Sequence, residues 1–247
     1  RHVAGVGGSD KQNWTMYCMP VVIAQSWNTT LSYSFGLSVA AESLSSGNNG
    51  WYAPGANIQR SPFCGRNSEY YSEDSLLSGK MAAESCRGAI ANGMNVYLKH
   101  FALNETESGR IGLFTWASEQ AIRENYLRSF EIAVKEGGAN GIMTALNRVG
   151  AVWAGANRAM TTEILRDEWG FKGSVVTDSY MGASYNPIKQ SLYGGVTLML
   201  GVGTSDTIDK SDLTLVAAAR KAAKDIIYAW CNSYTISKNH DHSQDII

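Results

Sequence analysis

The chain has 247 residues, of which 44% are hydrophobic and 17% are charged, and its formal net charge is -1. This length and composition are typical of one large globular domain with its own core. Nucleic acids and anionic membrane surfaces attract clustered Lys and Arg, so the balanced charge argues against both as partners. No apolar run is long enough to cross a bilayer. The partner we expect is a small or neutral molecule.

The cysteines and histidines give no metal or redox signature. No C-x-x-C pair occurs, so we interpret the cysteines as reduced, packed thiols and expect neither a metal nor a cofactor. No signal peptide is recognisable, but the chain opens on Arg1 instead of Met, so cytoplasmic and secreted bacterial locations both stay open. The residues concerned are Cys18, Cys64, Cys86 and Cys231, and His2, His100, His240 and His242, the last two in a polar tail.

Strand and helix patterns alternate along the chain. Short apolar runs bounded by Gly or Asn predict five strands, within residues 50–58, 94–101, 140–147, 173–179 and 194–202. Longer periodic stretches predict helices at 72–93, 118–138 and 211–233, with Asp74, Ser118 and Asp212 as N-caps. In the second of these helices, an apolar residue recurs at every fourth position from Ile122 to Val134. This order predicts a parallel sheet, either doubly wound or closed as a barrel.

Polar residues remain at the predicted strand ends once common motifs are excluded. The sequence has no G-x-G-x-x-G, no Walker lysine and no G-x-S-x-G, so dinucleotide, nucleotide and serine-hydrolase sites have little support. Asp178 directly follows the strand-like run 174–177, where it could cap a helix or handle a ligand. The other candidates are Arg66, Lys99, His100 and Arg110.

Three segments resemble a known family. WYAPGANIQRSPFCGRNSEYYSEDSLLSGKMA, YLKHFALNETESGR and ANRAMTTEILRDEWGFKGSVVTDS closely resemble the catalytic barrel of glycoside hydrolase family 3, which holds β-glucosidases and β-xylosidases. The resemblance runs from about Met19 through the helix that ends in IIYAWCNS. It implies an α/β fold of the (β/α)8 TIM-barrel type, incomplete at its N-terminal end. Residues 1–233 would form the barrel domain and residues 234–247 the polar tail.

The resemblance also implies roles for the polar residues. Asp178 matches the carboxylate that attacks the anomeric carbon, and Arg66, Lys99, His100 and Arg110 match residues that hold the sugar hydroxyls. The implied function is a retaining β-glycosidase, most simply a β-glucosidase, acting on terminal β-linked sugars by double displacement. Whether the substrate is a glucoside or a xyloside stays open. The alternative is a non-catalytic, carbohydrate-binding or structural barrel fragment of a larger assembly.

Several candidates also have plain structural explanations. Arg66 could pair with Glu69 or Glu73, since buried arginines usually have carboxylate partners. Glu105 and Glu107 are expected to be solvated loop carboxylates or partners of Arg110. Tyr70 and Tyr71 are expected in the core and not as a sugar platform.

The sequence departs from the family pattern near the proposed nucleophile. Ser179 stands where most members have Trp, Leu146 where they often have Tyr, and Thr197 where they usually have Asp. Tyr180 could replace one of the missing aromatic side chains. An opening segment whose Asp grips two sugar hydroxyls is not recognisable, and Arg1 would be its last residue.

No glutamate in the chain occupies a persuasive position for the general acid. In the β-glucosidase branch of the family this group comes from a second, α/β sandwich domain. We therefore expect a second domain or chain to supply the acid and base, with a β-glucoside or short β-linked oligosaccharide as substrate.

Overall fold

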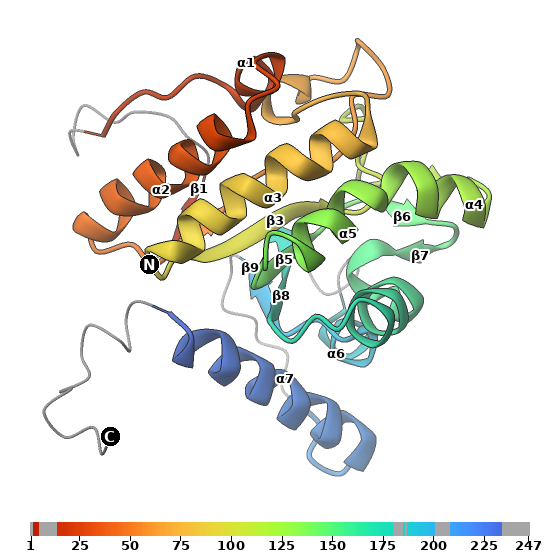
Figure 1. Ribbon diagram of the computed structural model, residues 1–247. Coiled ribbons are helices and arrows are strands. Elements are labelled where there is room, and N and C mark those ends of the chain that lie inside the picture. The colour runs from red at the N-terminus through yellow and green to blue at the C-terminus, as the bar shows by residue number, and fades with distance from the viewer. Residues whose placement is uncertain (1, 5–13, 180–184, 186, 201–207, 234–247) are drawn as a thin grey trace, which may run out of the picture.

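Six parallel strands in sequential order form the main sheet of the molecule (Figure 1). The computed structural model describes residues 2–4, 14–179, 185, 187–200 and 208–233. The order of the strands across this sheet follows their order along the chain. A doubly wound fold reverses its strand order once, so this order is that of a barrel wall. The strands are β1 (His2–Ala4), β2 (Gly50–Tyr52), β3 (Asn95–Phe101), β5 (Gly141–Thr144), β8 (Ser174–Ser179) and β9 (Leu198–Leu200).

The five predicted strands are all present, but the main sheet has a sixth strand, β1, and a second sheet contains three more that were not predicted. β1 pairs in parallel with β2, with His2 opposite Gly50 and Ala4 opposite Tyr52. A strand of three residues is too short to show an alternating pattern, and a glycine-rich run follows it in the sequence, so the usual strand signals are absent. The other neighbouring strands of this sheet also pair in parallel, as predicted.

The three predicted helices begin at the predicted caps. Asp74 accepts a hydrogen bond from the N–H of Leu77 at the start of α3 (Ser75–Ala91), and Asp212 accepts one from Leu215 at the start of α7 (Leu213–Cys231). The predicted helix 118–138 begins after the cap Ser118 but has three parts. These are α4 (Glu119–Ala121), the π-helical η2 (Ile122–Tyr126) and α5 (Arg128–Lys135).

Two helices before β2 were not predicted. They are α1 (Pro20–Gln25) and α2 (Thr29–Ser45), the second capped by Asn28. The sequence of α2 is rich in Ser, Thr and small residues, so it lacks the clear apolar stripe that predicts a helix. The remaining helical segments are η1 (Asn67–Glu69), η3 (Ala154–Ala156), the π-helical η4 (Ala159–Glu168) and α6 (Ile188–Gly194).

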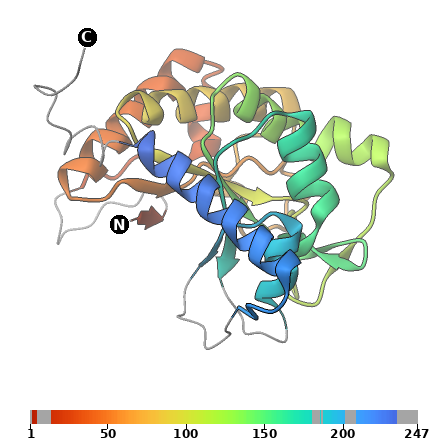
Figure 2. The same cartoon turned by 90° about the horizontal axis from the view of Figure 1, so that it is seen from below.

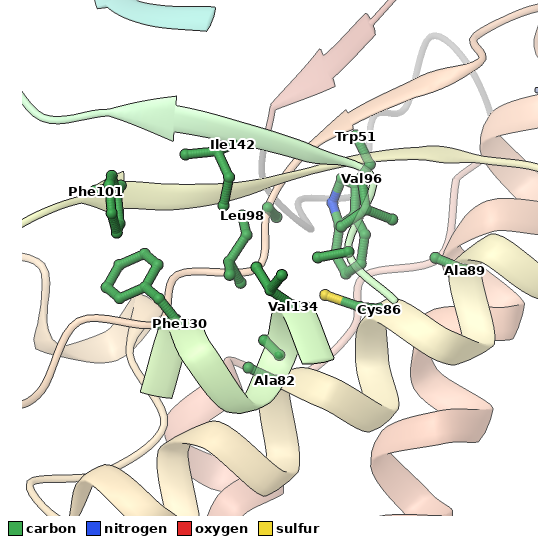
Figure 3. Close-up of a cluster of buried hydrophobic side chains, with 14 of the residues drawn as sticks. Trp51, Ala82, Cys86, Ala89, Val96, Leu98, Phe101, Phe130, Val134 and Ile142 are labelled. Carbon is green, nitrogen blue, oxygen red and sulfur yellow. The ribbon is translucent and has the colours of Figure 1, made fainter. Parts of the chain in front are cut away.

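The main core lies between the sheet and the helices α2, α3 and α5, which lie side by side along one face (Figures 1 and 3). Trp51 of β2 is fully buried, and the rings of Phe101 and Phe130 meet edge to face at 5.3 Å. Phe130 and Val134 of α5 point into this core, as the periodicity predicted. Burying the apolar surface of such aromatic and aliphatic side chains stabilises the folded state.

The cysteines are free thiols, and two of them correct the prediction that all are packed. Cys64 and Cys86 are buried, and burial raises the pKa of the Cys86 thiol strongly. Cys18 and Cys231 are exposed.

Two smaller units flank the main sheet. A three-stranded sheet contains β4 (Phe114–Thr115), β6 (Arg148–Val149) and β7 (Val152–Trp153). On another side, α7 packs against α6 through Leu192, Leu215 and Ala222 (Figure 2). Among the helices of the described residues, none combines the length and apolar character that a bilayer span requires.

Candidate active site

Asp178 is the penultimate residue of β8, and it and the four strand residues before it are all buried. Only 7% of its surface is exposed. Its Oδ1 accepts a hydrogen bond from the N–H of Ser179 at 2.7 Å, while Oδ2 is buried and has no hydrogen-bond partner among the described residues. The N-cap of α6 is Pro187, so Asp178 does not cap that helix. A buried carboxylate oxygen without a partner is costly and is characteristic of a functional position.

Two basic side chains face the free oxygen of Asp178. The Nε2 atom of His100 lies 3.8 Å from Oδ2, and the guanidinium of Arg110 lies 3.9 Å from it. His100 comes from the end of β3 and Arg110 from the loop that follows. Both distances exceed a hydrogen bond, so the three groups converge without being locked together.

His100 is buried and electrically neutral around pH 7. Burial first, and then the positive charges of Arg66, Lys99 and Arg110, lower its pKa well below the usual value. Its Nδ1 lies 3.5 Å from the hydroxyl oxygen of Tyr70, and this hydroxyl donates a hydrogen bond to the carbonyl of Asn104 at 3.2 Å. Tyr70 therefore supports the site from within the core, and both Tyr70 and Tyr71 are buried as predicted.

Arg66 and Lys99 share one carboxylate, Glu69. Arg66 holds Glu69 through two hydrogen bonds, of 3.1 and 2.8 Å, and the Lys99 Nζ lies 3.3 Å from Glu69 Oε2. Burial lowers the pKa of Lys99, and Glu69 and Asp178 partly offset this effect. The structural explanation for Arg66 is thus present, with Glu69 as the partner. Glu69 leaves other N–H groups of both cations available to a ligand.

The loop after β3 contains two glutamates with different surroundings. Glu107 forms an ion pair with Arg110 at 3.1 Å and accepts from Asn104 at 3.2 Å, as predicted for a partner of Arg110. The expectation that Glu105 is a solvated carboxylate is wrong. Only 2% of Glu105 is exposed, and burial raises its pKa to about 7. The fold draws it inward because Asn57 donates to it at 2.9 Å.

The remaining predicted residues have varied positions. Leu146 is buried, and its carbonyl accepts from the hydroxyl of Tyr185, which the sequence did not single out. Ser179 ends β8 and is exposed. The hydroxyl of Thr197, just before β9, accepts from the N–H of Val175 and donates to its carbonyl, so it is bound to the backbone of β8. Arg1, Tyr180 and the tail 234–247 lie outside the described residues.

A separate hollow of about 470 Å³ lies between η4, α6 and α7, away from Asp178. Asp225, on its wall, already pairs with Lys221 at 2.9 Å and with Arg166 at 3.2 Å. The convergent groups around Asp178 are therefore the better candidate site.

Comparison with known proteins gives one consistent family. The family model described as "Glycosyl hydrolase family 3 N terminal domain" matches residues 2–226. Beta-glucosidase A of Butyrivibrio fibrisolvens is 40% identical over 204 residues, which cover 81% of this chain and 24% of that protein.

Solved structures agree with this assignment. Beta-glucosidase 3B from Thermotoga neapolitana, in complex with alpha-D-glucose, is 30% identical with a TM-score of 0.83, over 94% of this chain and 34% of that one. A beta-glucosidase from Paenibacillus barengoltzii is 31% identical with a TM-score of 0.86, over 96% and 28%. The chain thus spans about a quarter to a third of the length of these relatives. The predicted fold, a TIM-barrel type that is incomplete, is confirmed, and the chain belongs to glycosyl hydrolase family 3, whose N-terminal domain it matches.

Proposed function

We propose that this chain provides the nucleophile and the sugar-binding groups of a retaining β-glucosidase. Its relatives are named β-glucosidases, and one related structure is a complex with glucose. The observation that carries the proposal is the buried Oδ2 of Asp178, which has no hydrogen-bond partner in the described part of the chain and has His100 and Arg110 within 4 Å.

Asp178 would act as the nucleophile in a double displacement. Its Oδ2 attacks the anomeric carbon while the bond to the leaving oxygen breaks, which gives a covalent glycosyl-enzyme with inverted configuration. Water then attacks the same carbon and releases Asp178, so the net configuration is retained. The N–H of Ser179 holds the other carboxylate oxygen and thereby fixes the direction of attack.

The basic residues would hold the sugar. Arg110 and Lys99 offer charged N–H donors to hydroxyl groups, and such donors form stronger hydrogen bonds than neutral ones. His100 is neutral, so it can donate or accept according to its tautomer. Arg66 would act mainly by fixing Glu69, which in turn orients Lys99.

The general acid and base would come from outside residues 1–247, from a second domain or chain. The three glutamates around the site are already engaged. Glu69 is held by Arg66 and Lys99, Glu107 by Arg110, and Glu105 by Asn57. Of the three, Glu107 is linked to Asp178 through a shared cation, because Arg110 pairs with both carboxylates.

The nucleophile can be tested directly with 2,4-dinitrophenyl β-glucoside, whose leaving group needs no proton. We expect Asp178→Gly to lower turnover by at least about 10³-fold, because the covalent route requires this carboxylate. Added azide should restore turnover and give α-glucosyl azide. Asp209→Asn, an exposed carboxylate elsewhere, serves as the control. Activity of Asp178→Gly within a few fold of the parent would remove Asp178 from this role, and glucose binding without any turnover would favour a non-catalytic sugar-binding domain.

A further inference from the structure

One buried amide connects the backbone of His100 to Glu105. The N–H of His100 donates to Asn57 Oδ1 at 2.7 Å, and Asn57 Nδ2 donates to the His100 carbonyl at 3.1 Å and to Glu105 Oε1 at 2.9 Å. Asn57 has no exposed surface, and His100 and Glu105 are almost as buried. Asn57 therefore grips both backbone groups of the residue whose ring faces Asp178.

The carboxyl group of Glu105 strengthens the orientation of the Asn57 amide that the backbone of His100 favours. If the Asn57 amide were turned over, its Nδ2 would meet the N–H of His100, and two donors would face each other. An ionised Glu105 only accepts hydrogen bonds, so it holds Nδ2 toward itself and leaves Oδ1 for His100. A protonated Glu105 can instead donate to Oδ1 and compete with the His100 N–H.

The surroundings of Glu105 place its change between the ionised and the protonated form near neutral pH. Burial raises its pKa to about 7, and the bond from Asn57 and the charge of Arg60 only partly offset that rise. Burial raises the pKa of the nearby Tyr70, and the negative charge of Glu105 adds to that rise. His100 itself is neutral in this range, because its own pKa is far lower than usual.

We propose that Glu105 is a positioning residue, which acts through Asn57 to hold His100 in place beside Asp178. The inference rests on the proposed function, in which His100 binds the sugar. The ionised form holds His100 better than the protonated form, so the efficiency of the site falls as the pH decreases through about 7.

The first test measures kcat/KM on 2,4-dinitrophenyl β-glucoside between pH 5 and 9, with wild type, Glu105→Gln and Glu105→Leu. Gln can accept from Asn57 but does not titrate, so we expect activity within a few fold of wild type and no inflection near pH 7. Leu cannot accept, so we expect a loss of about 10- to 100-fold at every pH, as for other residues that orient a site residue. Glu163→Gln, a half-exposed glutamate near Arg158, should keep the wild-type profile.

The second test does not depend on turnover. The chain contains four histidines, so ring-labelled histidine gives few NMR signals, and His100→Asn identifies the one from His100. We expect this signal to shift with an inflection near pH 7 in wild type and not in Glu105→Gln.

The outcomes separate the inference from the proposed function. If no variant hydrolyses the glucoside but the NMR inflection is seen and lost in Glu105→Gln, the proposed function fails and the positioning contact stands. If wild type and Glu105→Gln share one pH profile and one NMR titration, the positioning role is overturned. It is also overturned if Glu105→Gln loses cellobiose hydrolysis but keeps full activity on the dinitrophenyl substrate, because Glu105 would then be the acid.

Discussion

Lys99 has contacts that fit both a structural and a functional role. It forms an ion pair with Glu69, and the charge of Asp178 is close enough to affect its pKa. The sequence located Lys99 and Asp178 at strand ends, since a polar residue that closes an apolar run is visible in a single segment. It could not show that Glu69 serves two cations, because that depends on the packing of η1 against β3.

We expect Lys99→Met to lower kcat/KM by the equivalent of about 2–5 kcal/mol without unfolding the protein, because a charged donor to a sugar hydroxyl is lost in a water-poor site. Kinetics and thermal melts on the same samples check this. Lys80→Met is the matched control, since Lys80 pairs with Glu136 at 2.5 Å on the surface. A large fall in Tm with unchanged kinetics in Lys99→Met would make Lys99 structural.

The buried Glu105 makes stability depend on pH in an unusual direction. Its pKa rises from 4.5 to about 7 on folding, so the native state binds more protons than the unfolded state between these values. Its contribution to stability is therefore fully present below pH 4.5 and is lost as the pH rises through 7.

We expect Glu105→Gln to match wild type near pH 4.5 and to be more stable at pH 8, by up to about 3 kcal/mol. Urea unfolding at both pH values measures this difference. Glu163→Gln, which is half-exposed, should show no such dependence. Equal stability of Glu105→Gln and wild type at pH 8 would mean that Glu105 ionises without penalty.

At the level of elements, the helices with strong caps and apolar periodicity were predictable, whereas α2 was not. Its contacts with α3 depend on small residues, which leave no apolar stripe in the sequence. A Cβ on Gly36 would lie 2.0 Å from the Ser85 carbonyl oxygen, and one on Gly88 would lie 2.1 Å from that of Tyr33. The backbones of the two helices therefore lie close together. In the sequence, the only sign of this close approach is an isolated glycine in each helix.

We expect Gly88→Ala to destabilise the protein by about 1–3 kcal/mol, because the added methyl group meets backbone that cannot move aside easily. Elsewhere in a helix the same change would be favourable, by up to about 1 kcal/mol. Chemical denaturation is the measurement. Gly65→Ala, where a Cβ would meet nothing within 4 Å, is the control. A Gly88→Ala variant as stable as wild type would show that the helices can separate at little cost.

At the scale of the whole molecule, the sequential parallel sheet brings residues from distant segments to one edge. Arg66 comes from the segment between β2 and β3, Lys99 and Arg110 come from β3 and the loop after it, and Asp178 comes from β8. A single sequence shows the strand ends but not the distances between these side chains. The family resemblance supplied the grouping that local pattern could not. Glu105 was misjudged because a loop position suggests solvent, and only the fold shows that Asn57 draws it inward.

Because the three glutamates near the site are bound by other side chains, we expect the rate of the isolated chain to depend on the leaving group of the substrate. With the proton donor outside residues 1–247, this chain alone should hydrolyse cellobiose very slowly, because the departing alcohol needs a proton. A dinitrophenolate leaves as a stable anion, so 2,4-dinitrophenyl β-glucoside should still be cleaved through Asp178. Assays of the isolated chain on both substrates, side by side, measure this difference. Efficient cellobiose hydrolysis with a basic pH limb that disappears in Glu105→Gln or Glu107→Gln would instead place both carboxylates in this chain.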